Sequence, residues 1–154
     1  MANTKYEFVL GDEITIAPGR TVKRIRSLVA IAAFGLPAGS LGGYIESEKS
    51  LDVYGDAWVS GDARVYGDAR VSGDARVSGN AWVKTTPIHL IGLHWNVTIT
   101  PQNIVIGCEN HTHKEWDKFD NKRILAMAGK DAAVFWKAHK KTIMGFAKIQ
   151  ASLK

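Results

Sequence analysis

A six-residue repeat in the middle of the chain restricts the possible folds more than any other feature. From residue 53 the chain reads VYGDAW, VSGDAR, VYGDAR, VSGDAR and VSGNAW, and Val83 begins a further unit. In each unit, Ala–X–Val predicts a short strand with its outer residues inward and X outward. Gly-Asp or Gly-Asn predicts a tight corner, because glycine tolerates turn conformations and the Asx side chain can bond nearby amides. One corner per six residues excludes a helix or a hairpin meander, so we expect a coil whose strands pair with the turns above and below.

Residues 53–83 resemble the hexapeptide-repeat proteins that form a left-handed parallel β-helix. This resemblance implies three hexads in each triangular turn of eighteen residues, with an aliphatic and a small residue pointing inward. The handedness also comes from the resemblance, because the general rule for β-crossovers would favour the opposite hand. Ile45 and Leu51 lie six apart and extend the pattern toward the N-terminus. We therefore expect a mainly β fold, with N-terminal strands and the β-helix in residues 1–84.

Residues 85–154 are expected to form a β cap and two helices, in one compact unit with the solenoid. Three short strands are predicted in the first part, at 88–93, 95–100 and 103–106. They would form a meander that closes the open end of the solenoid. Thr112 and Glu115 match a capping box that opens a helix through about Met127. Gly129 would end it, and a second helix is expected from about 131 to 153, which completes a C-terminal helical hairpin.

Eighteen-residue stacking predicts which outward side chains meet. Residues eighteen apart should lie on adjacent coils, about 4.8 Å apart. The predicted pairs are Trp58 with Arg76, Arg64 with Trp82, Asp52 with Arg70, and Tyr66 with Lys84. These side chains can stabilise the coils as ladders, or they can face a ligand or a neighbouring subunit. The candidate ligand or interface residues are Trp58, Arg64, Tyr66, Arg70, Arg76 and Trp82, together with Lys137 and Lys141 of the last helix.

The positive charge of the chain is concentrated near its C-terminus. The formal net charge is +5, and residues 111–154 hold ten Lys and Arg against four Asp and Glu. Such a patch can attract nucleic acid, nucleotides or an acidic protein surface. The alternative interpretation is a solvated, lysine-rich helix face.

Enzyme chemistry finds little support in the residues. Hexapeptide-repeat enzymes are chiefly acyltransferases, and the resemblance implies a histidine base on a coil, yet all five histidines follow the repeat. Cys108, His111 and His113 are of types that suit zinc, but their tight spacing matches no strong signature. Phosphate-cradling glycine motifs are absent from the sequence. We expect neither a cofactor nor a metal, and an acyltransferase stays an alternative.

Two further features bear on origin and location. The segment GSLGGYIESEKSLD, and WNVTIT, IVIGC and HTHKEW after the repeat, resemble small hexapeptide-repeat proteins of tailed phages and prophages, which have no assigned activity. No apolar run approaches the roughly 20 residues that span a membrane. The single cysteine suits a reducing compartment, so the cytoplasm is expected, which is the host cytoplasm if a phage encodes the protein.

The sequence thus favours a non-catalytic phage accessory protein that acts as a homo-oligomer. The family resemblance implies trimers formed by packing the flat sides of the solenoids together. The site would be a groove between protomers, and it could counter host defence by sequestering a nucleotide signal or by occluding a host protein. The alternatives are an acyltransferase and a purely structural scaffold.

Overall fold

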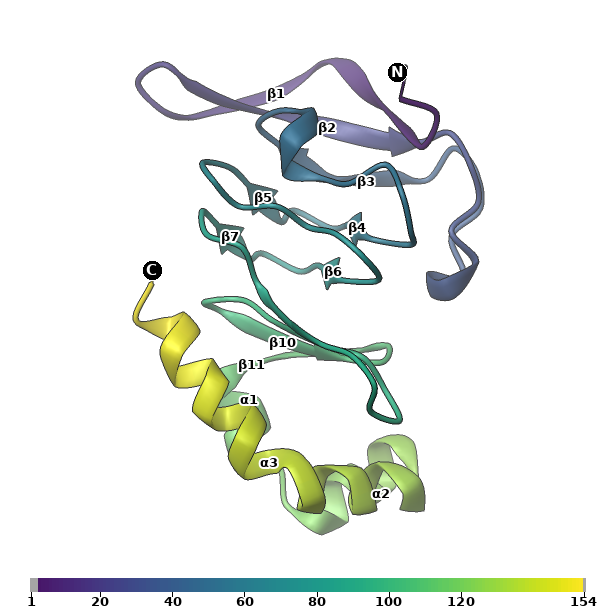
Figure 1. Ribbon diagram of the computed structural model, residues 1–154, viewed down its shortest axis with the longest axis vertical. Coiled ribbons are helices and arrows are strands. Elements are labelled where there is room, and N and C mark those ends of the chain that lie inside the picture. Colours follow the sequence, from purple (N-terminus) through teal and green to yellow (C-terminus); the bar gives the residue numbers. More distant parts are fainter. Residues whose placement is uncertain (1–2, 154) are drawn as a thin grey trace.

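The computed structural model describes residues 3–153, and its centre is a coil with three sides. On the first side, β3 (Leu41–Ile45), β5 (Arg64–Val65) and β7 (Trp82–Val83) pair in parallel. On the second side, β4 (Trp58–Val59) pairs in parallel with β6 (Arg76–Val77). A parallel bridge joins Leu51 to Val71 on the third. The stacked coils are visible in the middle of Figure 1.

The repeat supplies the core of this coil. Each Ala and Val of the repeat from 57 to 83 is at most 3% exposed, which confirms that both positions point inward. Burying one valine side chain contributes about 1.5 to 3 kcal/mol, so the short strands are stabilised chiefly by what they bury.

The first coil is longer than the repeat predicts. Leu51 lies beside Val71, twenty residues further on, whereas Trp58 lies beside Arg76, eighteen further on. Two extra residues therefore lie between Leu51 and Trp58. The first hexad is not a regular unit: Leu51 takes the inward place expected for Val53, which is only partly buried.

An antiparallel hairpin precedes the coil and extends its first sheet. Strands β1 (Tyr6–Ala17) and β2 (Arg20–Ser27) pair with each other, and β2 pairs antiparallel with β3. The sheet order is β1-β2-β3-β5-β7, so β3 is the strand at which pairing changes from antiparallel to parallel. Two short 3-10 turns, Ala32–Phe34 and Glu48–Ser50, lie between the strands. The hairpin covers the N-terminal end of the solenoid (Figure 1).

The expected meander follows the coil, with one strand more than predicted. Its members are β8 (Ile88–Leu90), β9 (Val97–Ile99), β10 (Asn103–Ile106) and β11 (Glu109–Thr112), all antiparallel. The fourth strand, β11, is polar and only partly buried, so its sequence carries no alternating apolar pattern. Gly107, at φ +57°, forms the tight turn that leads into it.

Within residues 3–153, three helices follow the meander, where two were expected. They are α1 (His113–Lys118), α2 (Asn121–Ala128) and α3 (Lys130–Ala151). The capping box of Thr112 and Glu115 is confirmed, but the prediction that its helix continues to about Met127 is wrong. The chain leaves the helix at Phe119, and the Asp120 carboxylate starts α2 by accepting a hydrogen bond from the Arg123 amide at 2.8 Å. Among residues 3–153, no helix is long and apolar enough to cross a membrane.

Candidate ligand-binding face

Four outward side chains form a ladder across the first side of the solenoid. The backbone register places Arg24 beside Tyr44, Tyr44 beside Arg64, and Arg64 beside Trp82. The Arg24 guanidinium lies 4.3 Å from the centre of the Tyr44 ring, and that of Arg64 lies 4.4 Å from the centre of the Trp82 ring. The predicted Arg64–Trp82 pair is thus confirmed, within a longer alternation of arginine and aromatic rings.

The upper half of the ladder has its hydrogen bonds satisfied. Arg24 donates to Asp12 at 2.8 Å, to the Gly42 carbonyl at 2.8 Å and to the Tyr44 hydroxyl at 2.8 Å. Burial raises the pKa of the Tyr44 hydroxyl, and its bond to Asp12 at 2.9 Å adds to that rise. These groups are committed to the protein itself, so we assign them a structural role.

The lower half of the ladder is open. The Trp82 side chain is 42% exposed, and the Arg64 Nε atom is buried without a hydrogen-bond partner in the part of the chain that the structure describes. A hollow of about 290 Å³ lies here, lined by Tyr66, Trp82, Lys84, Gln102 and Leu153. Gln102 fixes one wall, because its side-chain oxygen accepts a hydrogen bond from the Trp82 amide at 3.1 Å. We call these five residues and Arg64 the Trp82 face.

The Tyr66 ring has a different cationic partner from the one predicted. The predicted stack of Tyr66 with Lys84 is replaced by a contact with Arg20, whose guanidinium lies 5.6 Å from the Tyr66 ring. Arg20 also pairs with Glu46 at 3.3 Å, so that part of its charge is compensated. Tyr66 and Lys84 still line the same hollow.

Trp58 does not belong to the outer surface, and that prediction is wrong. Its side chain is 0% exposed, because the chain entering the first coil at Gly42 covers it. Arg76 lies beside Trp58 in register as predicted, yet its guanidinium packs over Phe34, 5.0 Å from the ring centre. Arg70 meets its predicted partner, since its guanidinium lies 3.3 Å from the Asp52 carboxylate.

The two lysines of the last helix lie at a separate place. Lys137 and Lys141 line a groove of about 560 Å³ with Lys140 and Lys148 on α3. None of these lysines lines the hollow of the Trp82 face, where Lys84 is the lysine present.

Two of the three weak metal candidates, the histidines, have other contacts. The His111 Nε2 atom lies 2.9 Å from the Glu109 carboxylate, and the His113 Nε2 atom lies 2.7 Å from the Thr100 carbonyl. Cys108 is exposed. Among residues 3–153, no group of three or more His, Cys, Asp or Glu could hold a metal ion.

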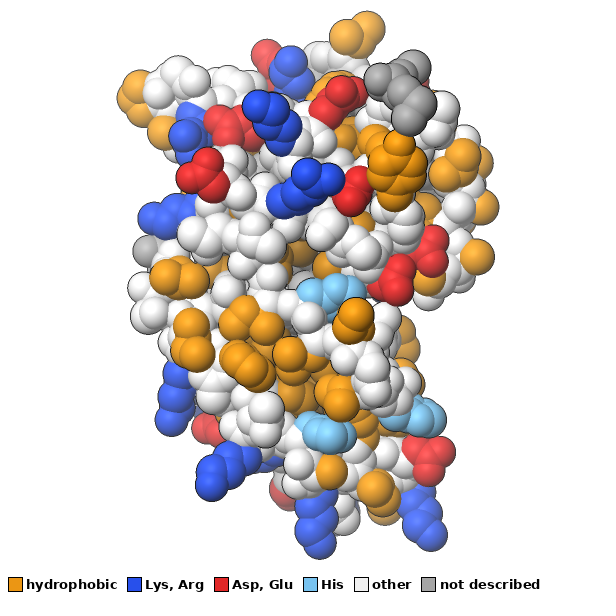
Figure 2. All heavy atoms as spheres, in the orientation of Figure 1, with side chains coloured by type: hydrophobic (Ala, Val, Ile, Leu, Met, Phe, Trp, Pro, Cys, Tyr) orange, Lys and Arg blue, Asp and Glu red, His pale blue; other side chains and the backbone are white. Residues whose placement is uncertain are grey.

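Sequence reasoning missed two hollows that surround the meander. A cleft of about 410 Å³ brings Asp56, Asp74 and Arg76 of the solenoid together with His94 of the meander. An apolar pocket lies between the meander and the helices, and Trp95 and Cys108 line both hollows. Figure 2 shows hydrophobic and histidine side chains gathered over this half of the molecule. Their residues come from distant segments, so no local spacing in the sequence could reveal them.

Comparison with known proteins identifies the repeat. The family model described as the YdcK beta solenoid repeat matches residues 63–79 and 69–84. This chain contains β-solenoid repeats. The two matches cover a small part of the chain, so they describe the β-solenoid and not its cap or helices. No curated protein and no solved structure matches the chain.

Proposed function

We propose that this protein is a non-catalytic binding protein whose Trp82 face takes a nucleotide. One observation carries the proposal: an exposed tryptophan, stacked on an arginine, lines a hollow together with a tyrosine and a lysine. Aromatic side chains stack on bases, and guanidinium groups pair with phosphates. The surface chemistry supports this class of ligand better than a neutral sugar or a peptide.

The charges at this face support an anionic ligand. Arg64 and Lys84 have no ion pair with a described carboxylate, whereas Arg24 and Arg20 do. A phosphate in the hollow would pair with the Lys84 ammonium group that lines it, and the Arg64 guanidinium, stacked on the Trp82 ring, adds positive charge beside it.

We propose in addition that the solenoid winds left-handed and that three chains pack by their sides to complete the hollow. The resemblance to hexapeptide-repeat proteins supports this arrangement, and the exposed Trp82 is of a residue type enriched in interfaces. Light scattering on the purified protein tests the trimer. A mass three times the 16.8 kDa of the chain is expected, and a monomer at all concentrations would contradict it.

For a phage accessory protein, the ligand would be a nucleotide signal of host defence. The same face could instead occlude a host protein, which purification from native or infected cells would reveal as a copurifying chain. A copurifying nucleotide supports the first version.

Equilibrium dialysis against labelled nucleotides tests the binding proposal. The native protein should retain a nucleotide at micromolar concentration, and Trp82→Ala should weaken retention about fivefold or more, because one stacked base contributes about 1 to 3 kcal/mol. Lys137→Ala is the matched control, because this lysine lies at the separate groove and its loss should leave retention unchanged. Absence of retention by the native protein, or equal retention by Trp82→Ala, would contradict the proposal.

A further inference from the structure

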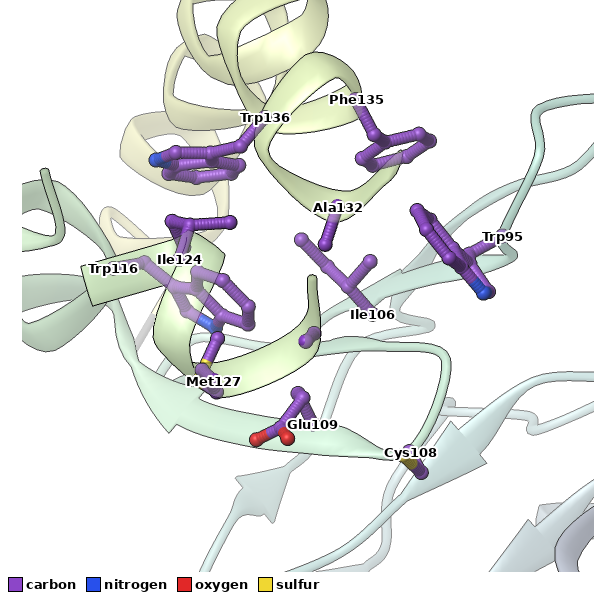
Figure 3. Close-up of a pocket in the computed structure, with 11 residues that line it drawn as sticks. Trp95, Ile106, Cys108, Glu109, Trp116, Ile124, Met127, Ala132, Phe135 and Trp136 are labelled. Atoms are coloured by element: carbon purple, nitrogen blue, oxygen red, sulfur yellow. The ribbon is translucent and has the colours of Figure 1, made fainter. Parts of the chain in front are cut away.

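An apolar pocket of about 250 Å³ lies between the meander and the helices, away from the Trp82 face. Figure 3 shows its walls: Trp95 and Phe135 stand on one side, Trp116 and Trp136 on the other, and Ala132 points into the space between them. We propose that this pocket binds a small planar aromatic molecule that is neutral or cationic.

The aromatic walls are held in place by contacts among themselves. The Trp95 and Phe135 rings meet edge to face, with centres 5.2 Å apart at 75°. The Trp116 and Trp136 rings lie 5.0 Å apart at 43°. The Trp116 indole also donates a hydrogen bond to the Ile104 carbonyl at 2.8 Å, which fixes its orientation. Because the rings are already ordered, a ligand would not have to order them on binding.

The size of the pocket sets the size of the ligand. A cavity of about 150 Å³ lined by aliphatic and aromatic side chains stays dry and binds benzene. The present pocket is larger, so it suits a molecule of about two fused rings. Ala132 creates this space, since a larger side chain at this position of α3 would fill it.

The polar groups of the pocket select the charge of the ligand. Glu109 is the one charged side chain among the described residues that line it. Its carboxylate is 2.9 Å from the His111 Nε2 atom. The Trp116 indole nitrogen already has an acceptor, and the buried, unpartnered Trp136 indole nitrogen points away from the space between the walls in Figure 3, so neither indole offers a donor to an anion there. A carboxylate ligand would meet repulsion from Glu109, whereas the faces of aromatic rings attract cations.

Three probes of similar shape and different charge test the proposal. Quinoline is neutral, 1-methylquinolinium is cationic, and 2-naphthoate is anionic at neutral pH. Titration calorimetry on the full chain should detect binding of the first two at millimolar concentration. Binding of 2-naphthoate should be about tenfold weaker or undetectable. Glu109→Gln should reduce the difference in binding affinity between the cationic and the anionic probe.

Variants that reduce the space locate the binding. Ala132→Phe should abolish binding of quinoline. Ala128→Leu, a smaller change at an exposed edge of the pocket, should weaken binding of quinoline, and it serves as the test if Ala132→Phe does not fold. Ala138→Leu is the matched control, because Ala138 is exposed on α3 and lies outside the pocket. Thermal unfolding of each variant checks that it is folded.

Three results would overturn the proposal. The first is no binding of quinoline or 1-methylquinolinium by the native protein. The second is unchanged binding in folded Ala132→Phe and Ala128→Leu. The third is 2-naphthoate binding as tightly as the cationic probe. None of them bears on nucleotide binding at the Trp82 face, which uses other residues.

Discussion

Trp58 is buried because the residue above it has no side chain. A Cβ atom placed on Gly42 would lie 2.6 Å from a side-chain atom of Ile25, 2.7 Å from the Val59 carbonyl and 2.8 Å from the Trp58 ring. The absence of that atom lets β3 approach the second side of the solenoid closely. The repeat alone gave no warning of this, since Trp58 occupies the same hexad position as the outward-facing Arg76.

Gly42→Ala should therefore destabilise the protein. The new methyl group must displace backbone as well as side chains, and overpacking of this kind costs about 1 to 3 kcal/mol or more. Urea unfolding measures the change. Gly145→Ala is the control: nothing lies within 4 Å of its added Cβ, and Ala stabilises a helix interior by about 1 kcal/mol relative to Gly. If the two variants were equally stable, the close packing at Gly42 would be wrong.

Tyr6 links the stability of the N-terminal strand to alkaline pH. Its side chain is 2% exposed, and its hydroxyl donates a hydrogen bond to the Leu51 carbonyl at 3.1 Å. Burial raises the pKa of the Tyr6 phenol from 10.0 to about 12, and the charge of Glu48 contributes to the rise. The phenol is thus ionised in the unfolded chain at a pH where the folded protein keeps its proton.

Stability from this group is complete below about pH 10 and is lost as the pH rises to about 12. A difference of two pKa units between the folded and the unfolded state corresponds to about 2 to 3 kcal/mol in the free energy of unfolding. When the pH rises from about 9 to about 12, the free energy of unfolding should fall by about 2 to 3 kcal/mol more in the native protein than in Tyr6→Phe. The reason is that Tyr6→Phe lacks the titrating phenol. The other tyrosines and the lysines titrate in both proteins, so their effects cancel in the difference between the two pH profiles. Parallel pH profiles of the two proteins would refute the assignment.

At the scale of elements, the backbone amides of the last coil have no further coil to bond. On each of the three sides of the solenoid, a side chain that follows the repeat accepts a hydrogen bond from one of these amides. Thr86 Oγ1 accepts from the Arg70 amide at 3.2 Å, and Thr98 Oγ1 accepts from the Arg76 amide at 3.2 Å. Gln102 accepts from the Trp82 amide on the remaining side. Solenoid ends need such caps, because unpaired strand edges promote association with other chains.

Thr98→Val tests this cap. Valine keeps the shape and the β propensity of Thr98, which is 3% exposed, but it leaves the Arg76 amide without its acceptor. The expected loss is about 1 to 3 kcal/mol in the free energy of unfolding. Thr86→Val is the matched control, since its bond is exposed to water and its loss should cost no more than about 0.5 kcal/mol. A loss of no more than about 0.5 kcal/mol in Thr98→Val would contradict its capping role.

The elements could be predicted to different degrees, for physical reasons. The repeat specifies its own strands, because each hexad buries the same two positions. The strand Glu109–Thr112 is set by pairing with β10 and has little apolar signal of its own. The break at Phe119 also escaped prediction, because Asp120 starts a new helix within a sequence that has no Gly or Pro there.

At the scale of the whole molecule, the described residues 3–153 form two hydrophobic clusters. One fills the solenoid and reaches Tyr6, and the other joins the meander to the helices around Trp116. The half of the candidate site that lies on the repeat, Arg64 with Trp82, could be predicted from a fixed spacing. The hollow beside it could not, because Gln102 and Leu153 arrive from the cap and the last helix. The placement of such segments depends on tertiary packing.

Disulfide formation between coils tests the winding on which the account depends. In a Cys108→Ser background, Ser60→Cys with Ser78→Cys joins equivalent positions of adjacent coils, where parallel strands lie about 4.8 Å apart, within disulfide range. Ser60→Cys with Ser72→Cys spans only twelve residues and joins different sides of the solenoid. On oxidation of the folded protein, thiol titration should show the first pair bonded and the second pair free. A bond in the second pair, or free thiols in the first, would contradict the eighteen-residue coil.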